Sequence, residues 1–412
     1  MKIGDFARQF NISTHAVRYY INIGLLVPTS RNNQFVFDAN DMVDLEEILK
    51  LKQLHFSIKE IHNILSLKRI SNFSNTSDAN DYIDVLNRKK SQLLLEQEDL
   101  VRAVDSLHKE MDLVSRRVTK RLFKGGVPFS VMQYFYCPYC QKPLDFSNVK
   151  IENQQILEGD LACSCGYTAD IRDGIVLTHD SAVSPYDYPD LERKCYKDLT
   201  PTTVSLLQKS YKWIVNHLNS INLSGKLILE SHLNAFCFLY THFDILDKNA
   251  IYVLVDCFPE IITMYKEKID SLNLGLNILY MVNSSSKYPL KHGCLDIHLD
   301  YFSTNEYSLF HENYNLTSTI MPYFGEKSHF IGTFFFLKKN SQSFMELKKR
   351  FPQMPDDAFL QPVFKKSIQD LPISMMDEDY TGFAVNTGNN QPFPLCVKGE
   401  KLGLYSFYYT KV

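Results

Sequence analysis

The sequence predicts a multidomain protein in which three kinds of structure follow one another. A helical N-terminal part continues into a long coiled-coil helix, then comes a small β unit that binds a metal, and then an α/β domain with a parallel sheet. Three observations support this fold class: a heptad repeat, two close pairs of cysteines, and an alternation of strands and helices. The chain of 412 residues is also longer than a domain with a single hydrophobic core usually is.

The amino-acid composition indicates what kind of protein this is and in which compartment it is expected. The chain is 45% hydrophobic and 22% charged, as in ordinary globular proteins, and its formal net charge of −3 means that any DNA-binding patch must be local. We find no signal peptide and no apolar run of membrane-spanning length, so we expect a cytoplasmic location and no membrane partner. In that compartment the nine cysteines favour a metal site and free thiols over disulfides.

The first segment has the pattern of a helix-turn-helix. Residues 2–10 place apolar side chains on one helical face, and Asn11-Ile12-Ser13 interrupts them. Ser13 can cap a second helix over residues 14–23, and Gly24 can end that helix in the left-handed conformation. The second helix of such a pair fits the major groove of DNA.

This segment resembles the MerR family of transcriptional regulators. The motifs that carry the resemblance are Ile3-Gly4-x-Phe6-Ala7, Val17-Arg18-Tyr19-Tyr20, Gly24-Leu25-Leu26-x-Pro28 and Phe56-Ser57-Ile58-Lys59-Glu60-Ile61. They keep their order and spacing over about the first 65 residues. We therefore predict a MerR-type winged helix-turn-helix DNA-binding domain over residues 1–77. A helical protein-binding module is the alternative.

The resemblance implies binding of double-stranded promoter DNA as a dimer, with RNA polymerase as a further partner. The resemblance implies that Arg18 contacts a phosphate of the DNA backbone. His15 lies one helical turn earlier, within reach of a base edge. The predicted DNA-binding residues are His15, Arg18, Tyr19, Tyr20 and Arg31. The wing departs from the family pattern, since Asn33-Gln34-Phe35 stands where Gly-Tyr-Arg is usual, and Ala16 replaces a common threonine. Residues 1–37 still carry four basic side chains against one acidic side chain.

Residues 83–118 carry the heptad repeat. Ten positions from Leu86 to Val118 are separated alternately by four and three residues, and eight of them are apolar. Such a repeat is the seam of a coiled coil, whereas a long helix lying on its own domain is the alternative. We predict a coiled-coil dimerisation helix over residues 78–123, and hence a homodimer. Its predicted seam is Leu86, Leu93, Leu100, Val104, Leu107, Met111 and Val114.

Two cysteine pairs follow a predicted hinge at Lys124–Pro128. Cys137 and Cys140 are separated by two residues, and Cys163 and Cys165 by one. Two such pairs across a β-hairpin supply four thiolates, which favours zinc, with iron, scattered thiols or a redox pair as alternatives. Four protein ligands leave no position for a substrate, so we expect a structural zinc in a ribbon over residues 128–182. The layout resembles the zinc ribbon that precedes the methyltransferase domain of certain ribosomal RNA guanine methyltransferases.

Residues 185–412 alternate between strand and helix. We expect strands at 226–230, 251–256 and 277–282, with helices at 202–218 and 234–243 and another through Tyr265. A further strand at 329–337 and a closing antiparallel hairpin from 383–385 and 404–409 complete the domain. This order resembles a class I S-adenosylmethionine (SAM)-dependent methyltransferase. The resemblance implies cofactor-binding roles for Glu230 and Asp256, the latter at the ribose.

The first loop of this domain departs from the family pattern. A glycine-rich turn normally lets the backbone approach the cofactor, but Glu230-Ser231-His232-Leu233-Asn234 contains none. We therefore expect a degenerate domain, with SAM disfavoured as a cofactor and no catalytic residue assigned. Two functions remain open. One is a transcriptional regulator whose C-terminal domain is a partner platform or a sensor of an unknown small-molecule effector. The other is an active methyltransferase, acting on RNA or a small molecule, with an appended DNA-binding domain.

Overall fold

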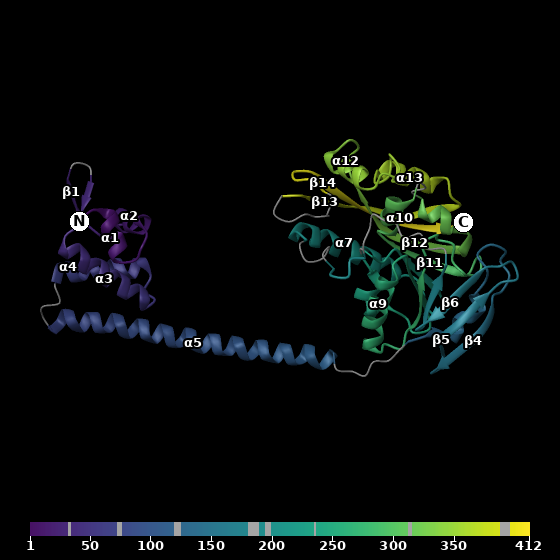
Figure 1. Cartoon of the computed structure of the whole chain (residues 1–412), viewed down its shortest axis with the longest axis horizontal. Helices are drawn as coiled ribbons and strands as arrows, with labels where there is room; N and C mark the ends of the chain where they lie inside the picture. Colours follow the sequence, from purple (N-terminus) through teal and green to yellow (C-terminus); the bar gives the residue numbers. More distant parts are fainter. Residues whose placement is uncertain are drawn as a thin grey trace. The chain divides into compact units, whose positions relative to one another are not determined.

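The computed structural model divides the chain into two compact units, Met1–Arg116 and Arg117–Val412 (Figure 1). It describes residues 1–31, 34–71, 76–118, 125–179, 189–193, 199–234, 236–311, 315–387 and 396–412. Among the described residues, none of the helices combines the length and the apolar character that crossing a bilayer requires.

The first unit begins with a helix-turn-helix followed by a two-stranded antiparallel hairpin. Its elements are α1 (Ile3–Gln9), α2 (Thr14–Asn22), β1 (Thr29–Arg31), β2 (Gln34–Val36), α3 (Ala39–Gln53) and α4 (Ile58–Ser71). The Ser13 side chain accepts a hydrogen bond from the Ala16 amide, and Gly24 has φ +76°, so both predicted helix signals are confirmed. Asn33 of the predicted wing lies outside the described residues.

A single long helix, α5 (Thr76–Val118, 43 residues), follows α4. Its first turns pack Tyr82, Val85 and Leu86 against the core of the first unit. Lys89 is 8% exposed and its Nζ donates to Glu60 Oε2 at 3.0 Å, which fastens α5 to the start of α4. Beyond Lys89 the helix presents both apolar and polar side chains to solvent.

One twelve-stranded sheet runs through the second unit. Its order is β13-β14-β12-β11-β8-β9-β10-β7-β6-β5-β3, and β4 pairs with β5. The strands are β3 (Val127–Pro128), β4 (Asp145–Glu152), β5 (Gln155–Ala162), β6 (Thr168–Arg172), β7 (Ile175–Thr178), β8 (Leu227–Ser231), β9 (Ile251–Asp256), β10 (Asn277–Val282), β11 (Leu295–Tyr301), β12 (Phe324–Phe336), β13 (Ile373–Val385) and β14 (Lys401–Lys411).

The centre of this sheet is parallel and buried on both faces. Every residue of β8 and β9 is buried, as expected for strands covered by helices on both sides. Helices α7 (Pro201–Leu218), α9 (Pro259–Leu272) and α12 (Gln342–Arg350) pack into one core, and α11 (Leu316–Ile320) and the buried residues of α13 (Gln361–Gln369) pack into the other. Helix α10 (Ser303–Phe310) contributes to both cores, with Leu309 in the first and Tyr307 in the second. The predicted α/β architecture is thus confirmed.

The cysteine-rich β unit is continuous with this sheet. Strands β4 to β7 are antiparallel to one another, and β7 then pairs in parallel with β10. The predicted hinge at Lys124–Pro128 does not extend over residues 125–128, because these are buried, and Lys124 lies outside the described residues. The Gly125 amide donates to Asp270 at 2.9 Å, and a Cβ at Gly174 would collide with the Gly125 carbonyl. These glycines therefore permit close packing rather than motion.

Two predicted elements of the α/β domain need correction. Instead of a helix over 234–243, the described part of this segment forms only α8 (Phe238–Thr241) and a 3-10 turn at Phe243–Ile245. The strand predicted at 329–337, β12, begins at Phe324 rather than His329, because Phe324 already pairs with Leu295 of β11 before a register shift. The closing antiparallel hairpin is confirmed as β13 and β14, both longer than predicted.

Candidate functional site

The second helix of the N-terminal unit presents three predicted contact residues to solvent. His15, Arg18 and Tyr19 are exposed on α2, and Arg31 is exposed on β1. Neither Arg18 nor Arg31 has a salt-bridge partner among the described residues. Two cations free of acidic partners, on a helix and an adjacent hairpin, are suited to contact phosphate oxygens.

Tyr20 is a core residue, contrary to the prediction. Only 3% of its surface is exposed, and its hydroxyl accepts a hydrogen bond from Lys52 Nζ at 3.2 Å. On a helix, Tyr20 and Val17 lie three residues apart on the face that packs against the rest of the unit. The periodicity of α2 alone could have assigned Tyr20 to the buried side.

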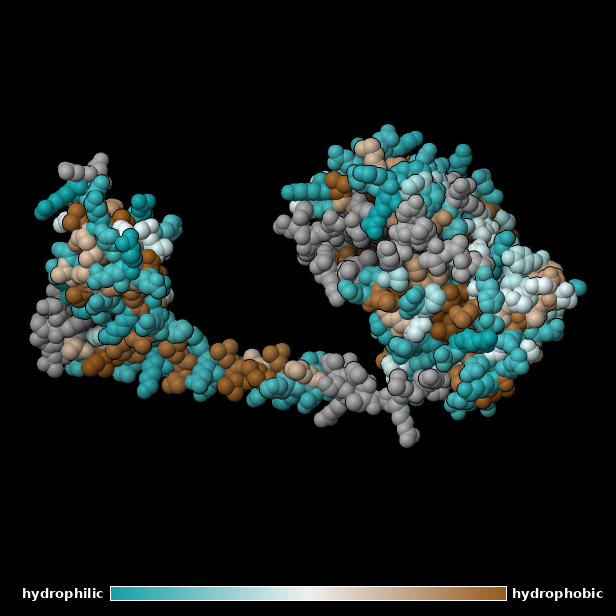
Figure 2. Space-filling model, in the orientation of Figure 1, coloured by the Kyte–Doolittle hydropathy of each residue, from teal (hydrophilic) through white to brown (hydrophobic). Residues whose placement is uncertain are grey.

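The free part of α5 carries an exposed apolar row (Figure 2). Leu100, Val104, Leu107 and Met111 are between 49% and 67% exposed, although each is a predicted seam residue. Leu93 is half-buried, Leu86 rests on the core of the first unit, and the Val114 side chain lies outside the described residues. Covering such an apolar row with a partner helix removes it from water and is therefore favourable.

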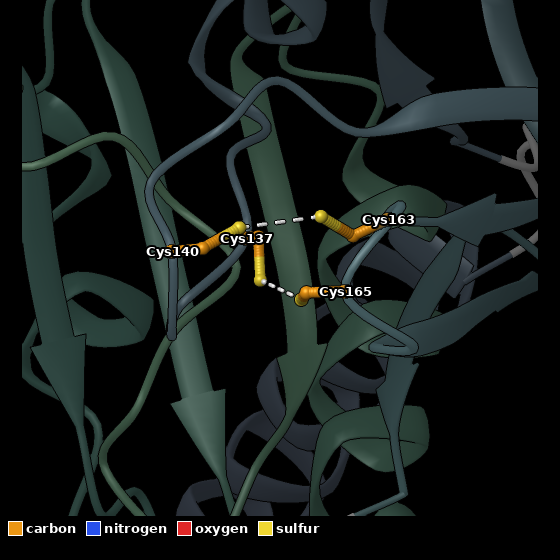
Figure 3. Close-up of side chains that lie close together, drawn as sticks. All are labelled: Cys137, Cys140, Cys163 and Cys165. Atoms are coloured by element: carbon orange, nitrogen blue, oxygen red, sulfur yellow. Dashed lines mark hydrogen bonds between the residues drawn. The ribbon is translucent and has the colours of Figure 1, made fainter.

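The four paired cysteines come together at one point (Figure 3). Their sulfur atoms all lie within 4.8 Å of one another, and Cys137–Cys165 and Cys140–Cys163 are each 3.4 Å apart. Zn–S bonds of about 2.3 Å in a tetrahedron separate sulfur atoms by about 3.8 Å, so the donor set fits a zinc ion. The backbone hydrogen bond from Cys165 lowers the pKa of Cys163 to about 7, whereas burial raises the pKa of Cys137 to about 12, so the fit to a metal rests on the sulfur geometry.

A residue that the sequence did not single out fastens this cysteine cluster to the α/β domain. Gln141, in the left-handed conformation, follows Cys140 directly. Its side-chain Nε2 donates to the Leu290 carbonyl at 3.4 Å, and its Oε1 accepts from the His292 amide at 2.8 Å. The first cysteine pair therefore holds the segment that leads into β11.

The strand order reverses between β8 and β11, where doubly wound folds bind their ligands. Glu230 near the end of β8 is 1% exposed, and its carboxylate accepts from the amides of Phe238 and Leu239. Burial raises the pKa of Glu230 to about 7. This carboxylate therefore caps α8 instead of facing an open crevice.

Asp256 at the end of β9 also accepts hydrogen bonds from backbone amides. Its two oxygens accept from the amides of Asn234 and Phe258, each at 2.9 Å, and it is 2% exposed. Burial raises the pKa of Asp256 to about 6, against the opposing effect of these hydrogen bonds. A ribose hydroxyl would have to displace a backbone donor to reach it.

The loops at the reversal point also pack against each other. His232 has φ +58° and lies edge-on to the Tyr307 ring, with 5.6 Å between centroids. Ser303 Oγ donates to the Ser231 carbonyl, and the Phe302 ring stacks on Phe335 at 3.9 Å. The loops at the reversal point are thus held to one another by contacts among the protein's own residues.

Comparison with known proteins identifies the first 68 residues of the N-terminal unit. Residues 1–68 match the MerR HTH family regulatory protein model, so the chain carries a MerR HTH family domain at its N-terminus. The "Heavy metal-dependent transcription regulator 2" of Rhizobium meliloti (strain 1021) is 31% identical, and the "HTH-type transcriptional regulator HmrR" of Sinorhizobium medicae (strain WSM419) 32%, each over 71 residues. That stretch is 17% of this chain and 48% of each relative, so the chain spans about half the length of the curated relatives it matches.

Among solved structures, the chain is similar to the MccD protein, with 12% identity, a TM-score of 0.38 and coverage of 49% of this chain and 96% of that one. A SAM-dependent methyltransferase from Aquifex aeolicus gives 14% identity and a TM-score of 0.35 over 53% and 97% of the two chains. These scores are too low to support an argument about activity. The architecture of the α/β domain therefore rests on the strand order described above.

Proposed function

We propose that the protein is a dimeric transcriptional regulator that binds promoter DNA. In this proposal the C-terminal domain is a sensor or partner platform that transfers no methyl groups. The observation that carries the proposal is the exposed apolar row on α5, immediately after a MerR HTH family domain. Pairing of two such helices would bury the row and present two copies of α2 to an inverted-repeat site. RNA polymerase would be the further partner at the promoter.

Two buried carboxylates that already accept hydrogen bonds from backbone amides favour this function over that of a methyltransferase. Glu230 and Asp256 are retained, but both are buried and satisfied by backbone amides of the adjacent loops. The zinc at the cysteine cluster would be structural, since it would hold the segment before β11 through Gln141. In the alternative function, the enzyme would transfer label from tritiated SAM to RNA or a small molecule. Transfer that is lost in Asp256→Ala would establish that alternative.

DNA binding is tested with the full-length protein. A site is selected from a random double-stranded library, and affinity is then measured by fluorescence anisotropy across a salt series. Arg18→Ala should weaken binding to all sequences and lower the slope of log K against log salt by about 1, as expected for one lost phosphate contact. Lys109→Ala, an exposed cation of α5, is the matched control and should leave both unchanged. Wild-type affinity of Arg18→Ala at every salt concentration would refute the assignment of Arg18.

A further inference from the structure

A hollow of about 670 Å³ opens beside the end of β12. Its walls come from Phe336 at the end of β12, the second half of β13, the first residues of β14, the cap residue of α12 and the first residues of α13. The three strands form one edge of the sheet (Figure 1). Among the described residues, its lining includes none from the loops that follow β8, β9 and β11. The hollow is therefore separate from the reversal point, and its volume suits a small organic ligand.

Aromatic rings form one side of this hollow. Tyr380 is 56% and Phe383 41% exposed, and Phe336 lies with its ring centroid 6.0 Å from that of Tyr380. A Cβ at Gly403 would collide with the Phe336 ring, so glycine is required for this ring to lie flat on β14. Exposed aromatic faces gathered around a hollow favour a ligand with a flat apolar body.

The charges at the hollow are mainly positive. Lys338 and Lys401 line it, and within the described part of the chain neither forms a salt bridge. Lys401 Nζ lies 3.9 Å from the centroid of the Phe383 ring, which places a cation directly at the aromatic wall. These positions disfavour a cationic ligand and favour an anionic one.

The acidic residue in the lining is already engaged. Glu400 accepts hydrogen bonds from the amides of Gln342 and Ser343, at 2.8 Å and 2.7 Å, so its charge is offset by the N-terminus of α12. The N-terminus of α13 has Leu360 at its cap position and no side-chain cap, which adds positive potential on the same side.

We propose that this hollow binds an organic anion with a flat apolar body, such as an aromatic carboxylate, and that it is the effector site of the regulator. The claim that the ligand is an effector rests on the proposed function. The claim that the hollow binds such a ligand rests on the hollow alone. The rings of Phe336, Tyr380 and Phe383 bury the apolar body, and the two lysines pair with the anionic group. Binding regulates DNA affinity only if the ligand favours one arrangement of the protein over another.

The binding part is tested by calorimetry on the full-length, zinc-loaded protein with 2-naphthoate and its neutral analogue 2-naphthamide. We expect one naphthoate per chain, bound roughly tenfold more tightly than the amide, a ratio that corresponds to about 1.4 kcal/mol, because only the carboxylate can pair with the lysines. The double variant Lys338→Met/Lys401→Met should lose this preference, and Tyr380→Ala should weaken both ligands. Lys366→Met, an exposed lysine of α13 outside the hollow, is the matched control and should behave as wild type.

Four outcomes overturn the inference, in whole or in part, and they are distinguishable. Absence of saturable naphthoate binding, or equal binding of the two ligands, refutes the anion site. Unchanged preference in the double lysine variant places the site elsewhere. Circular dichroism and thermal melting of each variant show whether a loss of binding reflects unfolding. If naphthoate binds but leaves DNA affinity unchanged, the effector role is wrong, whereas naphthoate binding without any DNA binding refutes the proposed function instead.

Discussion

Replacing His298 with leucine should change how the stability of the α/β domain depends on pH. His298 lies in the middle of β11, is fully buried, and has no hydrogen-bond partner among the described residues for either ring nitrogen. Its ring faces Phe324 and Phe330, with centroids 6.0 Å and 6.3 Å away. Burial lowers the pKa of His298 from 6.5 to about 3, so the folded protein keeps the ring neutral near neutral pH.

The size of the effect follows from proton linkage. Between about pH 3 and 6.5 the unfolded chain protonates this histidine and the folded chain does not, so stability falls as the pH falls through that window. At about pH 5 the solution is about 1.5 pH units below the pKa of this histidine in the unfolded chain. The free energy of unfolding is therefore about 2 kcal/mol lower there than at about pH 7.5. Glu230 and Asp256, whose pKa values burial raises to about 7 and about 6, act in the opposite direction but are unchanged in the variant.

Trp213 provides a specific signal for this measurement. It is the single tryptophan of the chain and packs against the core of the α/β domain on α7, so its fluorescence reports unfolding of that domain. His298→Leu should be more stable than wild type by roughly 1–3 kcal/mol near pH 7.5, because two unsatisfied buried groups are removed, and by about 2 kcal/mol more near pH 5. A difference in urea stability between the two proteins that is the same at both pH values would refute the reasoning.

Two further predictions concern the other sites. Leu100→Pro should break α5 at a cost of roughly 3 kcal/mol or more and yield monomers in sedimentation, whereas Leu100→Met should keep the dimer; a dimeric proline variant would place the interface elsewhere. Cys140→Ser should lower zinc, measured by elemental analysis, from one ion per chain to nearly none, while Cys294→Ser, outside the cysteine cluster, should retain it. Pure wild-type protein without zinc or iron would end the metal assignment.

Several features follow from the sequence because they depend on neighbours along the chain. Ser13 and Gly24 set the ends of α2 through local hydrogen bonding and backbone conformation. The predicted bounds of β9 and β10 coincide with the observed ones, since continuous apolar runs mark strands buried on both faces. The spacing of the cysteines likewise predicted that their four sulfur atoms would meet.

Other features were decided only by the tertiary structure. The sequence predicts that Glu230 and Asp256 lie at the ends of two strands, but not that the amides of Leu239 and Asn234 donate hydrogen bonds to their carboxylates, because loop conformation depends on contacts between distant elements. The parallel pairing of β7 with β10, which joins the cysteine-rich unit to the main sheet, has no local signal either. The hollow beside Phe336 needs strands and helices separated by dozens of residues to converge. Periodicity thus determined which elements form, and long-range packing determined which side chains are free to bind a ligand.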